Sequence, residues 1–160
     1  MKIYHGSLEV VEHPMIILPN RKLDYGEGFY TTTSEKQSKE WAERRMLEKH
    51  STYAYVNAYE FEDKKLSDFK SLIFSEPNRE WVEFVMANRT QKGFTHDYDI
   101  VYGPVANDRV YLQFGLYESG AISVETLIRE LRTYKLIDQY LFHTERALTS
   151  LHFIEAIKIE

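Results

Sequence analysis

Residues 53–61 show the clearest alternation of side chains in the sequence. Tyrosine, asparagine and phenylalanine occupy the odd positions, and alanine, valine and glutamate occupy the even positions. Because successive side chains of a strand point to opposite faces of a sheet, this period of two predicts a β-strand. Other segments rich in apolar and aromatic side chains predict further strands over 1–7, 29–33, 99–102, 139–144 and 151–159.

Helix starts are indicated by residues that suit the first turn. Ser34, followed three residues later by Gln37, matches a capping box and predicts a helix over about 35–49. Pro77 is expected at the first position of a second helix, where its fixed φ fits and its missing N–H is not needed. Further helices are expected from Asn107 or Asp108 to Gly120, from Ser123 to about residue 133, and over 145–148.

The predicted strands and helices do not alternate regularly along the chain. Their order predicts an α+β fold of packed antiparallel sheets with peripheral helices, rather than a parallel sheet built from βαβ units. The length of 160 residues and the hydrophobic fraction of 43% suit one compact domain over 1–160. Residues 8–23 are expected to form a loop, because Pro14 and Pro19 interrupt regular structure.

Charge and cysteine content narrow the possible functions. The net charge of -5 argues against an extensive nucleic-acid surface. The absence of cysteine excludes disulfides, thiolate catalysis and zinc–thiolate sites. The N-terminal residues lack the apolar stretch of a signal peptide, and no apolar run is long enough to span a bilayer. We therefore expect a cytoplasmic protein without a membrane partner.

Several motifs that would carry chemistry are missing from the sequence. It contains no GxxxxGK(S/T) phosphate loop, no HExxH metal helix and no GxSxG nucleophile elbow. The six histidines lack the spacing of metal ligands, so no metal site is expected. Gly26 and Gly28 lack the third glycine of a dinucleotide fingerprint, and they precede an expected strand rather than a helix.

Three segments together resemble the ADP-ribosyltransferase superfamily. They are Tyr4–Ser7 on the first strand, Gly26–Tyr30 followed by Ser38 and Trp41, and Asp138–Phe142. Their order and spacing are similar to the His-Tyr-Glu class, which includes diphtheria-type toxins and poly(ADP-ribose) polymerases. The whole chain resembles an uncharacterised family of small bacterial domains placed in that superfamily. The resemblance implies an ADP-ribosyltransferase-like split pair of antiparallel sheets with peripheral helices.

The resemblance also implies that NAD+ is a co-substrate, and it assigns roles to the matching residues. His5 would hydrogen-bond an NAD+ ribose, and the backbone of Gly6 would hold the nicotinamide amide. Tyr30 falls on the tyrosine that packs against nicotinamide. Ser38, eight residues later, would bond the carboxamide, and Trp41, eleven residues later, would stack where the polymerases have a second tyrosine.

The third motif departs from the class, because Gln139 stands where the class has glutamate. A glutamine can hydrogen-bond a ribose hydroxyl, but it accepts no proton and carries no charge. A general base contributes about 10²–10⁴-fold to a rate, so either the acceptor needs no base or another residue supplies one. The candidates are Glu145 and His143, which is expected on the same strand face as Gln139.

The function predicted from this resemblance is NAD+-dependent mono-ADP-ribosyl transfer to a protein or nucleic-acid acceptor. The acidic net charge favours a protein acceptor. The resemblance to small bacterial members implies a toxin or defence effector, for which an antitoxin or inhibitor partner is expected. Two alternatives stay open: a module that binds NAD+, ADP-ribose or a protein without chemistry, and an NAD+ glycohydrolase. For the glycohydrolase, the substitution Gln139→Glu is expected to raise hydrolysis.

The same residues also have plain structural interpretations. His5 suits a hydrogen-bonded histidine of the core, and Tyr30 and Trp41 suit core aromatic residues. Asp24 is expected to be a turn residue that can organise the loop over the NAD+ site. The functional interpretation therefore depends on all three segments occurring together in the order of the superfamily.

Overall fold

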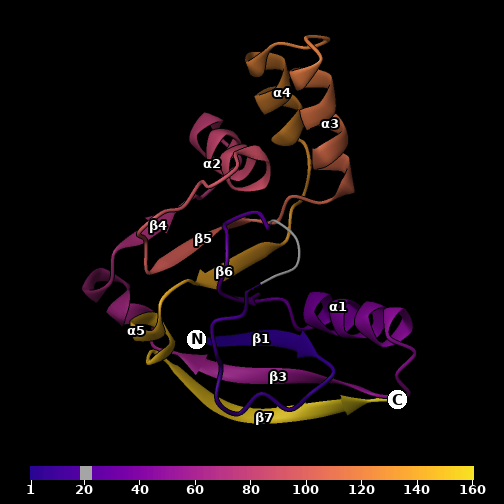
Figure 1. Cartoon of the computed structure of the whole chain (residues 1–160), viewed down its shortest axis with the longest axis vertical. Helices are drawn as coiled ribbons and strands as arrows, with labels where there is room; N and C mark the ends of the chain where they lie inside the picture. Colours follow the sequence, from indigo (N-terminus) through magenta and orange to yellow (C-terminus); the bar gives the residue numbers. More distant parts are fainter. Residues whose placement is uncertain (19–22) are drawn as a thin grey trace.

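The computed structural model describes residues 1–18 and 23–160, which form an α+β fold with two sheets (Figure 1). The strands are β1 (Lys2–Ser7), β2 (Phe29–Thr31), β3 (Ala54–Phe61), β4 (Ser71–Ile73), β5 (Ile100–Pro104), β6 (Asp138–Phe142) and β7 (Leu151–Ile159). The helices are α1 (Glu35–Glu48), the 3-10 helix η1 (Asp63–Asp68), α2 (Arg79–Thr90), α3 (Asp108–Glu118), α4 (Val124–Leu131) and α5 (Glu145–Leu148). Residues 8–18 form neither helix nor strand, as predicted, and Pro19 lies outside the described residues.

The two sheets differ in how their strands pair. One has the order β1-β3-β7, and both of its pairs are antiparallel. The other has the order β2-β6-β5-β4. The prediction of antiparallel sheets is wrong for the second, because β4 pairs parallel to β5. The chain between these two strands contains α2, and a crossover of this length lets a strand return in the same direction.

The sheets meet where β1 passes β2. Tyr4 and Thr32 form an antiparallel bridge there, with backbone N–O distances of 2.8 and 3.0 Å. Figure 1 shows α1 beside β1 and β3, and α2, α3 and α4 grouped beyond β5 at the far end of the molecule. The bridge brings the first candidate motif, on β1, next to the second, on β2.

Two hydrophobic cores lie on opposite faces of the four-stranded sheet. One fills the space between this sheet and α2, α3 and α4, and it contains the fully buried side chains of Trp81 and Leu127. The other lies between the two sheets and contains Ile3 and Phe142. Strand β6 contributes to both, because its alternate side chains point to opposite faces, so that Leu141 faces the helices.

The helix starts agree with the sequence prediction, with one correction. The Ser34 hydroxyl accepts a hydrogen bond from the Gln37 N–H at 3.1 Å and caps α1. The first helical position of α2 is not Pro77. Asn78 is the N-cap, because its side chain accepts from the Trp81 N–H at 2.9 Å, and Pro77 lies before the helix.

Candidate functional site

His5 lies at the junction of the two sheets. Its Nδ1 atom is 2.7 Å from the carbonyl oxygen of Tyr30, and a carbonyl can only accept, so Nδ1 carries the proton. Its ring packs against Phe29, with centroids 4.2 Å apart. Burial lowers the pKa of His5, and the hydrogen bond to Tyr30 opposes this effect. The neutral ring then leaves Nε2 as a hydrogen-bond acceptor.

Tyr30 and Gln139 share one face of the second sheet. Tyr30 is paired with Leu141 in the β2–β6 register, so their side chains are on the same face. Gln139 is two residues from Leu141 and also points to this face. The His5 ring instead packs on Phe29, whose side chain lies on the opposite face of β2. The predicted residues therefore come from neighbouring strands, but their side chains form two groups.

The Tyr30 hydroxyl is held by the loop that precedes its strand. It donates a short hydrogen bond to the Gly26 carbonyl oxygen and accepts one from the Tyr25 N–H at 3.1 Å. Burial raises the pKa of Tyr30 well above its ordinary value. The phenol is therefore uncharged at neutral pH and fixed in orientation.

The Gln139 side chain is only 4% exposed and binds through its amide nitrogen. Nε2 is 3.1 Å from Oδ2 of Asp24 and 3.4 Å from the carbonyl oxygen of Pro104. Both N–H groups of the amide thus have an acceptor within the protein. Asp24 belongs to the same loop as Gly26, so this loop connects Gln139 to Tyr30.

Asp24 is a buried carboxylate, 7% exposed, with partners from distant parts of the chain. Its Oδ2 accepts from the Ala106 N–H at 2.9 Å as well as from Gln139. Its Oδ1 accepts from the Tyr111 hydroxyl and lies 3.6 Å from Nη1 of Arg89. The sequence indicated a turn residue that could organise a loop, but no pattern around Asp24 predicted this buried network. Asp24 is therefore an additional member of the site.

Two aromatic side chains and two glycines fix the rest of this loop. The Tyr25 hydroxyl donates to the Pro104 carbonyl oxygen at 2.7 Å and accepts from Nε1 of Trp81 at 2.9 Å. Gly26 and Gly28 have φ values of 86° and 146°, which disfavour any other residue. A Cβ atom on Gly28 would also lie 2.5 Å from a backbone oxygen of β6. The Asp24–Gly28 loop is consequently held tightly against β5 and β6.

The two candidate bases do not contact Gln139. His143 follows the last residue of β6, and its Nδ1 is 2.6 Å from the Glu27 carbonyl oxygen. Its ring lies against His96, with centroids 4.2 Å apart. Glu145 is exposed at the start of α5. His143 thus supports the far end of the Asp24–Gly28 loop, away from the amide.

The remaining candidates lie where α1 packs against β1. A Cβ atom on Gly6 would be 2.1 Å from the Ser38 carbonyl oxygen, so the close approach of the helix requires glycine. The Ser38 hydroxyl is fully buried and donates to the Glu35 carbonyl oxygen at 2.9 Å. Trp41 is half-buried on the same helix, three residues after Ser38. Gly6 and Ser38 are therefore in contact, through backbone packing.

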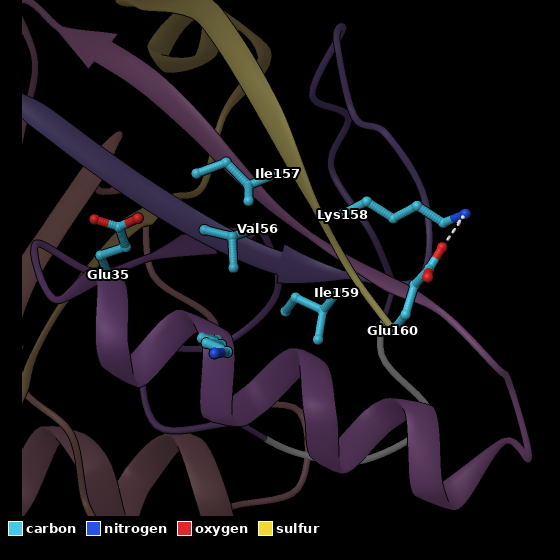
Figure 2. A pocket seen from close by; sticks show the side chains of 7 residues that line it. Glu35, Val56, Ile157, Lys158, Ile159 and Glu160 are labelled. Atoms are coloured by element: carbon cyan, nitrogen blue, oxygen red, sulfur yellow. Dashed lines mark ion pairs between the residues drawn. The ribbon is translucent and has the colours of Figure 1, made fainter.

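A separate groove lies between α1 and the β3–β7 pair (Figure 2). Its floor includes Val56, Ile157 and Ile159, and its volume is about 380 Å³. Lys158 and Glu160 at its rim pair with each other at 2.8 Å. It contains none of the residues predicted to bind NAD+.

Neither a metal cluster nor a membrane-spanning helix is found in the part of the chain that the structure describes. No group of three or more His, Asp or Glu side chains among residues 1–18 and 23–160 could hold a metal ion. No helix within these ranges is long and apolar enough to cross a membrane.

Comparison with known proteins identifies one family. The model of a family described as "Protein of unknown function (DUF3990)" matches residues 1–153, which is most of the chain. No curated protein and no solved structure matches the sequence or the fold.

Proposed function

We propose that this chain, which belongs to the DUF3990 family of proteins of unknown function, is an NAD+-dependent mono-ADP-ribosyltransferase. The proposal assigns it an ADP-ribosyltransferase-like arrangement of the two sheets. His5, Tyr30 and Gln139 are the proposed catalytic residues. Gly6, Ser38 and Trp41 complete the proposed nicotinamide site.

One observation carries the proposal. The three motifs of the resemblance lie far apart in the sequence, yet β1, β2 and β6 are neighbours in space. His5 bonds the backbone of Tyr30, and Tyr30 is tied to Gln139 through the Asp24–Gly28 loop. Support for the proposal comes from this meeting of the three motifs at neighbouring strands.

The available atoms suit part of the chemistry. Cleaving the bond between nicotinamide and ribose builds positive charge on the sugar, as in glycoside hydrolysis. His5 Nε2 and Gln139 Oε1 are acceptors for ribose hydroxyls, and Tyr30 supplies an aromatic face. Asp24 is the carboxylate in contact with Gln139, and its oxygens already accept hydrogen bonds from Gln139, the Ala106 N–H and the Tyr111 hydroxyl. Transfer to an acceptor that needs no base, such as a protein carboxylate, therefore fits better than polymer extension.

A binding module for NAD+ or ADP-ribose is the second candidate, and a specific observation favours it. The Tyr30 hydroxyl, the Gln139 amide nitrogen and the Ser38 hydroxyl are all engaged within the protein. The His5 ring is also on the other face of β2 from Tyr30. Such a site can hold a ligand while contributing little to its cleavage.

The test is calorimetric titration of NAD+ into the wild type and into His5→Ala and Tyr30→Ala. His152→Ala and Tyr53→Ala are matched controls, because both residues are exposed and contact none of the proposed site. We expect binding by the wild type and by both controls, with a loss of tenfold or more in the two site variants. Absence of binding by the wild type would overturn the proposal.

Product analysis then separates the activities. Nicotinamide release together with a labelled macromolecule supports the transferase. Free ADP-ribose without any labelled macromolecule supports an NAD+ glycohydrolase. Binding without nicotinamide release, even with lysate added as a source of acceptors, supports the binding module. Growth arrest on cytoplasmic expression, absent in His5→Ala, is expected of a toxin or defence effector that normally has an inhibitor partner.

A further inference from the structure

The amide of Gln139 has one orientation that satisfies its neighbours. Nε2 faces two acceptors, Oδ2 of Asp24 at 3.1 Å and the Pro104 carbonyl oxygen at 3.4 Å. A flipped amide would place Oε1 against both of these oxygens and lose both hydrogen bonds. The two N–H groups are therefore directed into the protein.

This orientation leaves the carbonyl oxygen of Gln139 for other partners. Both N–H groups are used by Asp24 and Pro104, and no hydrogen bond to Oε1 is found within residues 1–18 and 23–160. A side chain held in this way presents only an acceptor. In that respect it offers the same hydrogen bond that a glutamate carboxylate would offer.

Asp24 is itself held from three directions. The Ala106 N–H binds Oδ2, the Tyr111 hydroxyl binds Oδ1, and Arg89 lies 3.6 Å from Oδ1. The Arg89 guanidinium also packs over the Tyr111 ring, 4.5 Å from its centroid. These contacts come from α2, α3 and the chain after β5, so the carboxylate has a fixed position beside the amide.

We propose that Asp24 is a positioning residue that fixes the Gln139 amide with its carbonyl oxygen toward the ligand. The ligand group that this oxygen takes is a hydroxyl donor, namely a hydroxyl of the nicotinamide ribose, and this part rests on the proposed function. The negative charge of the site is then carried by Asp24 rather than by residue 139. Gln139 acts as an acceptor because Asp24 binds its amide nitrogen and so fixes the orientation of the amide.

The same geometry explains why residue 139 is an amide. A carboxylate at this position would lie about 3 Å from the buried carboxylate of Asp24 and beside the Pro104 carbonyl oxygen. Like charges this close cannot both ionise without a large penalty. For Gln139→Glu the structure therefore adds the expectation of a loss of stability at neutral pH. The gain of hydrolysis expected from this substitution in a glycohydrolase stays a prediction.

The contact between Asp24 and residue 139, called the pairing below, is tested first by thermal unfolding at pH 7.5, which needs no ligand. We expect Gln139→Glu to lower the Tm of the wild type by roughly 5–10 °C. Asp24→Asn removes the opposing charge, so the same Gln139→Glu change should cost less than half as much in that background. An equal cost in both backgrounds would overturn the pairing.

A matched control uses a second buried amide. Asn57 donates to the His5 and Glu9 carbonyl oxygens and contacts no carboxylate, so it resembles Gln139 without the Asp24 neighbour. The cost of Asn57→Asp should be the same with and without Asp24→Asn. If Asp24→Asn also lowered the cost of Asn57→Asp, its effect would not be specific to Gln139. That result would count against the contact between Asp24 and Gln139 as the cause.

The positioning role is tested by ligand selectivity. NAD+ is compared with analogues that lack the 2′- or the 3′-hydroxyl of the nicotinamide ribose, using calorimetry. We expect the wild type to prefer NAD+ over one analogue by about tenfold, and Asp24→Ala, which removes both acceptor oxygens, to lose this preference. Tyr111→Phe, which removes one donor to Asp24 but keeps its charge, should reduce the preference and is available if Asp24→Ala does not fold.

The outcomes separate this inference from the proposed function. If the wild type binds no NAD+, the proposed function and the ribose assignment fail, while the unfolding series still decides whether Asp24 orients Gln139. If NAD+ binds and Asp24→Ala keeps the full preference, the proposed function stands and the positioning role is overturned. Loss of preference with coupled unfolding costs supports both.

Discussion

The imidazole rings of His96 and His143 lie 4.2 Å apart, and each binds a carbonyl oxygen of the same loop. Nε2 of His96 is 2.7 Å from the Tyr25 oxygen, and Nδ1 of His143 is 2.6 Å from the Glu27 oxygen. Since carbonyls only accept, both rings donate from these nitrogens. The Tyr98 N–H binds Nδ1 of His96 at 3.2 Å, which requires His96 to be neutral.

Stability is expected to fall in mild acid through His96. Burial lowers its pKa, the Tyr25 oxygen opposes this, His143 lowers it further, and Asp97 and Glu27 raise it. A histidine with a lowered folded pKa binds its proton more readily when unfolded. The stability that neutral His96 contributes to the folded state is therefore complete above about pH 6.5. It is lost as the pH falls from there toward the pKa of His96 in the folded protein.

The measurement is urea unfolding of the wild type and His96→Gln between pH 5 and pH 8. The free energy of unfolding of the wild type should decrease with acid, and His96→Gln should show a shallower decrease. His5 also has a lowered pKa from burial, so part of the slope should remain. An unchanged slope in His96→Gln would contradict the assignment, and exposed His152→Gln serves as the control.

Gly6→Ala is expected to separate α1 from β1. The new Cβ atom would lie 2.1 Å from the Ser38 carbonyl oxygen and 3.0 Å from the Ala42 backbone nitrogen, neither of which can move without the helix. We expect a loss of about 2–4 kcal/mol of unfolding free energy, in the range of overpacked and strained sites.

Gly115→Ala is the matched control for this change. Gly115 lies within α3, and nothing lies within 4 Å of the position of its Cβ atom. Alanine is the better helix former by about 1 kcal/mol, so this variant should be more stable than the wild type in the same urea titration. Equal effects of the two substitutions would show that the packing of α1 on β1 is looser than described.

Tyr25→Phe is expected to destabilise the protein although it removes a single oxygen. The hydroxyl donates to the Pro104 carbonyl oxygen and accepts from Nε1 of the fully buried Trp81. Without it the Trp81 N–H would lose its acceptor in the core, at a cost of about 1–3 kcal/mol before relaxation, while the Pro104 oxygen would keep the Gln139 N–H. Chemical unfolding should show a clear loss, with Tyr53→Phe, an exposed tyrosine, near neutral.

The elements with strong local signals were predictable from the sequence. The side-chain types of β3 alternate with a period of two along the sequence, although its pairing with β7 shifts register between Ala58 and Tyr59. Ser34 and Asn107 cap their helices with their own side chains. Strand β4 has three residues, too few to show a period, and it forms by pairing with β5. Pro77 and Asn78 are both good helix starts, and only the contact from Asn78 to Trp81 N decides between them.

The contacts of the candidate site could not be predicted from local sequence patterns, because they join residues that are far apart in the chain. Asp24 meets Ala106 and Gln139, which are 82 and 115 positions later in the chain. A turn composition around Asp24 says nothing of these partners. The resemblance between motifs predicted that His5, Tyr30 and Gln139 belong together, and the structure places their strands side by side but the His5 ring on the other face from Tyr30. Their binding of NAD+ stays a prediction.

The order of strands β1-β3-β7 has a consequence for synthesis on the ribosome. Strand β3 can pair with β1 early, but its other edge pairs with β7, which is translated about 90 residues later. At ordinary elongation rates this edge stays open for on the order of ten seconds. An open strand edge invites pairing with other chains. Aggregation is therefore most expected during synthesis, when nascent chains with an open β3 edge lie close together on the same polysome.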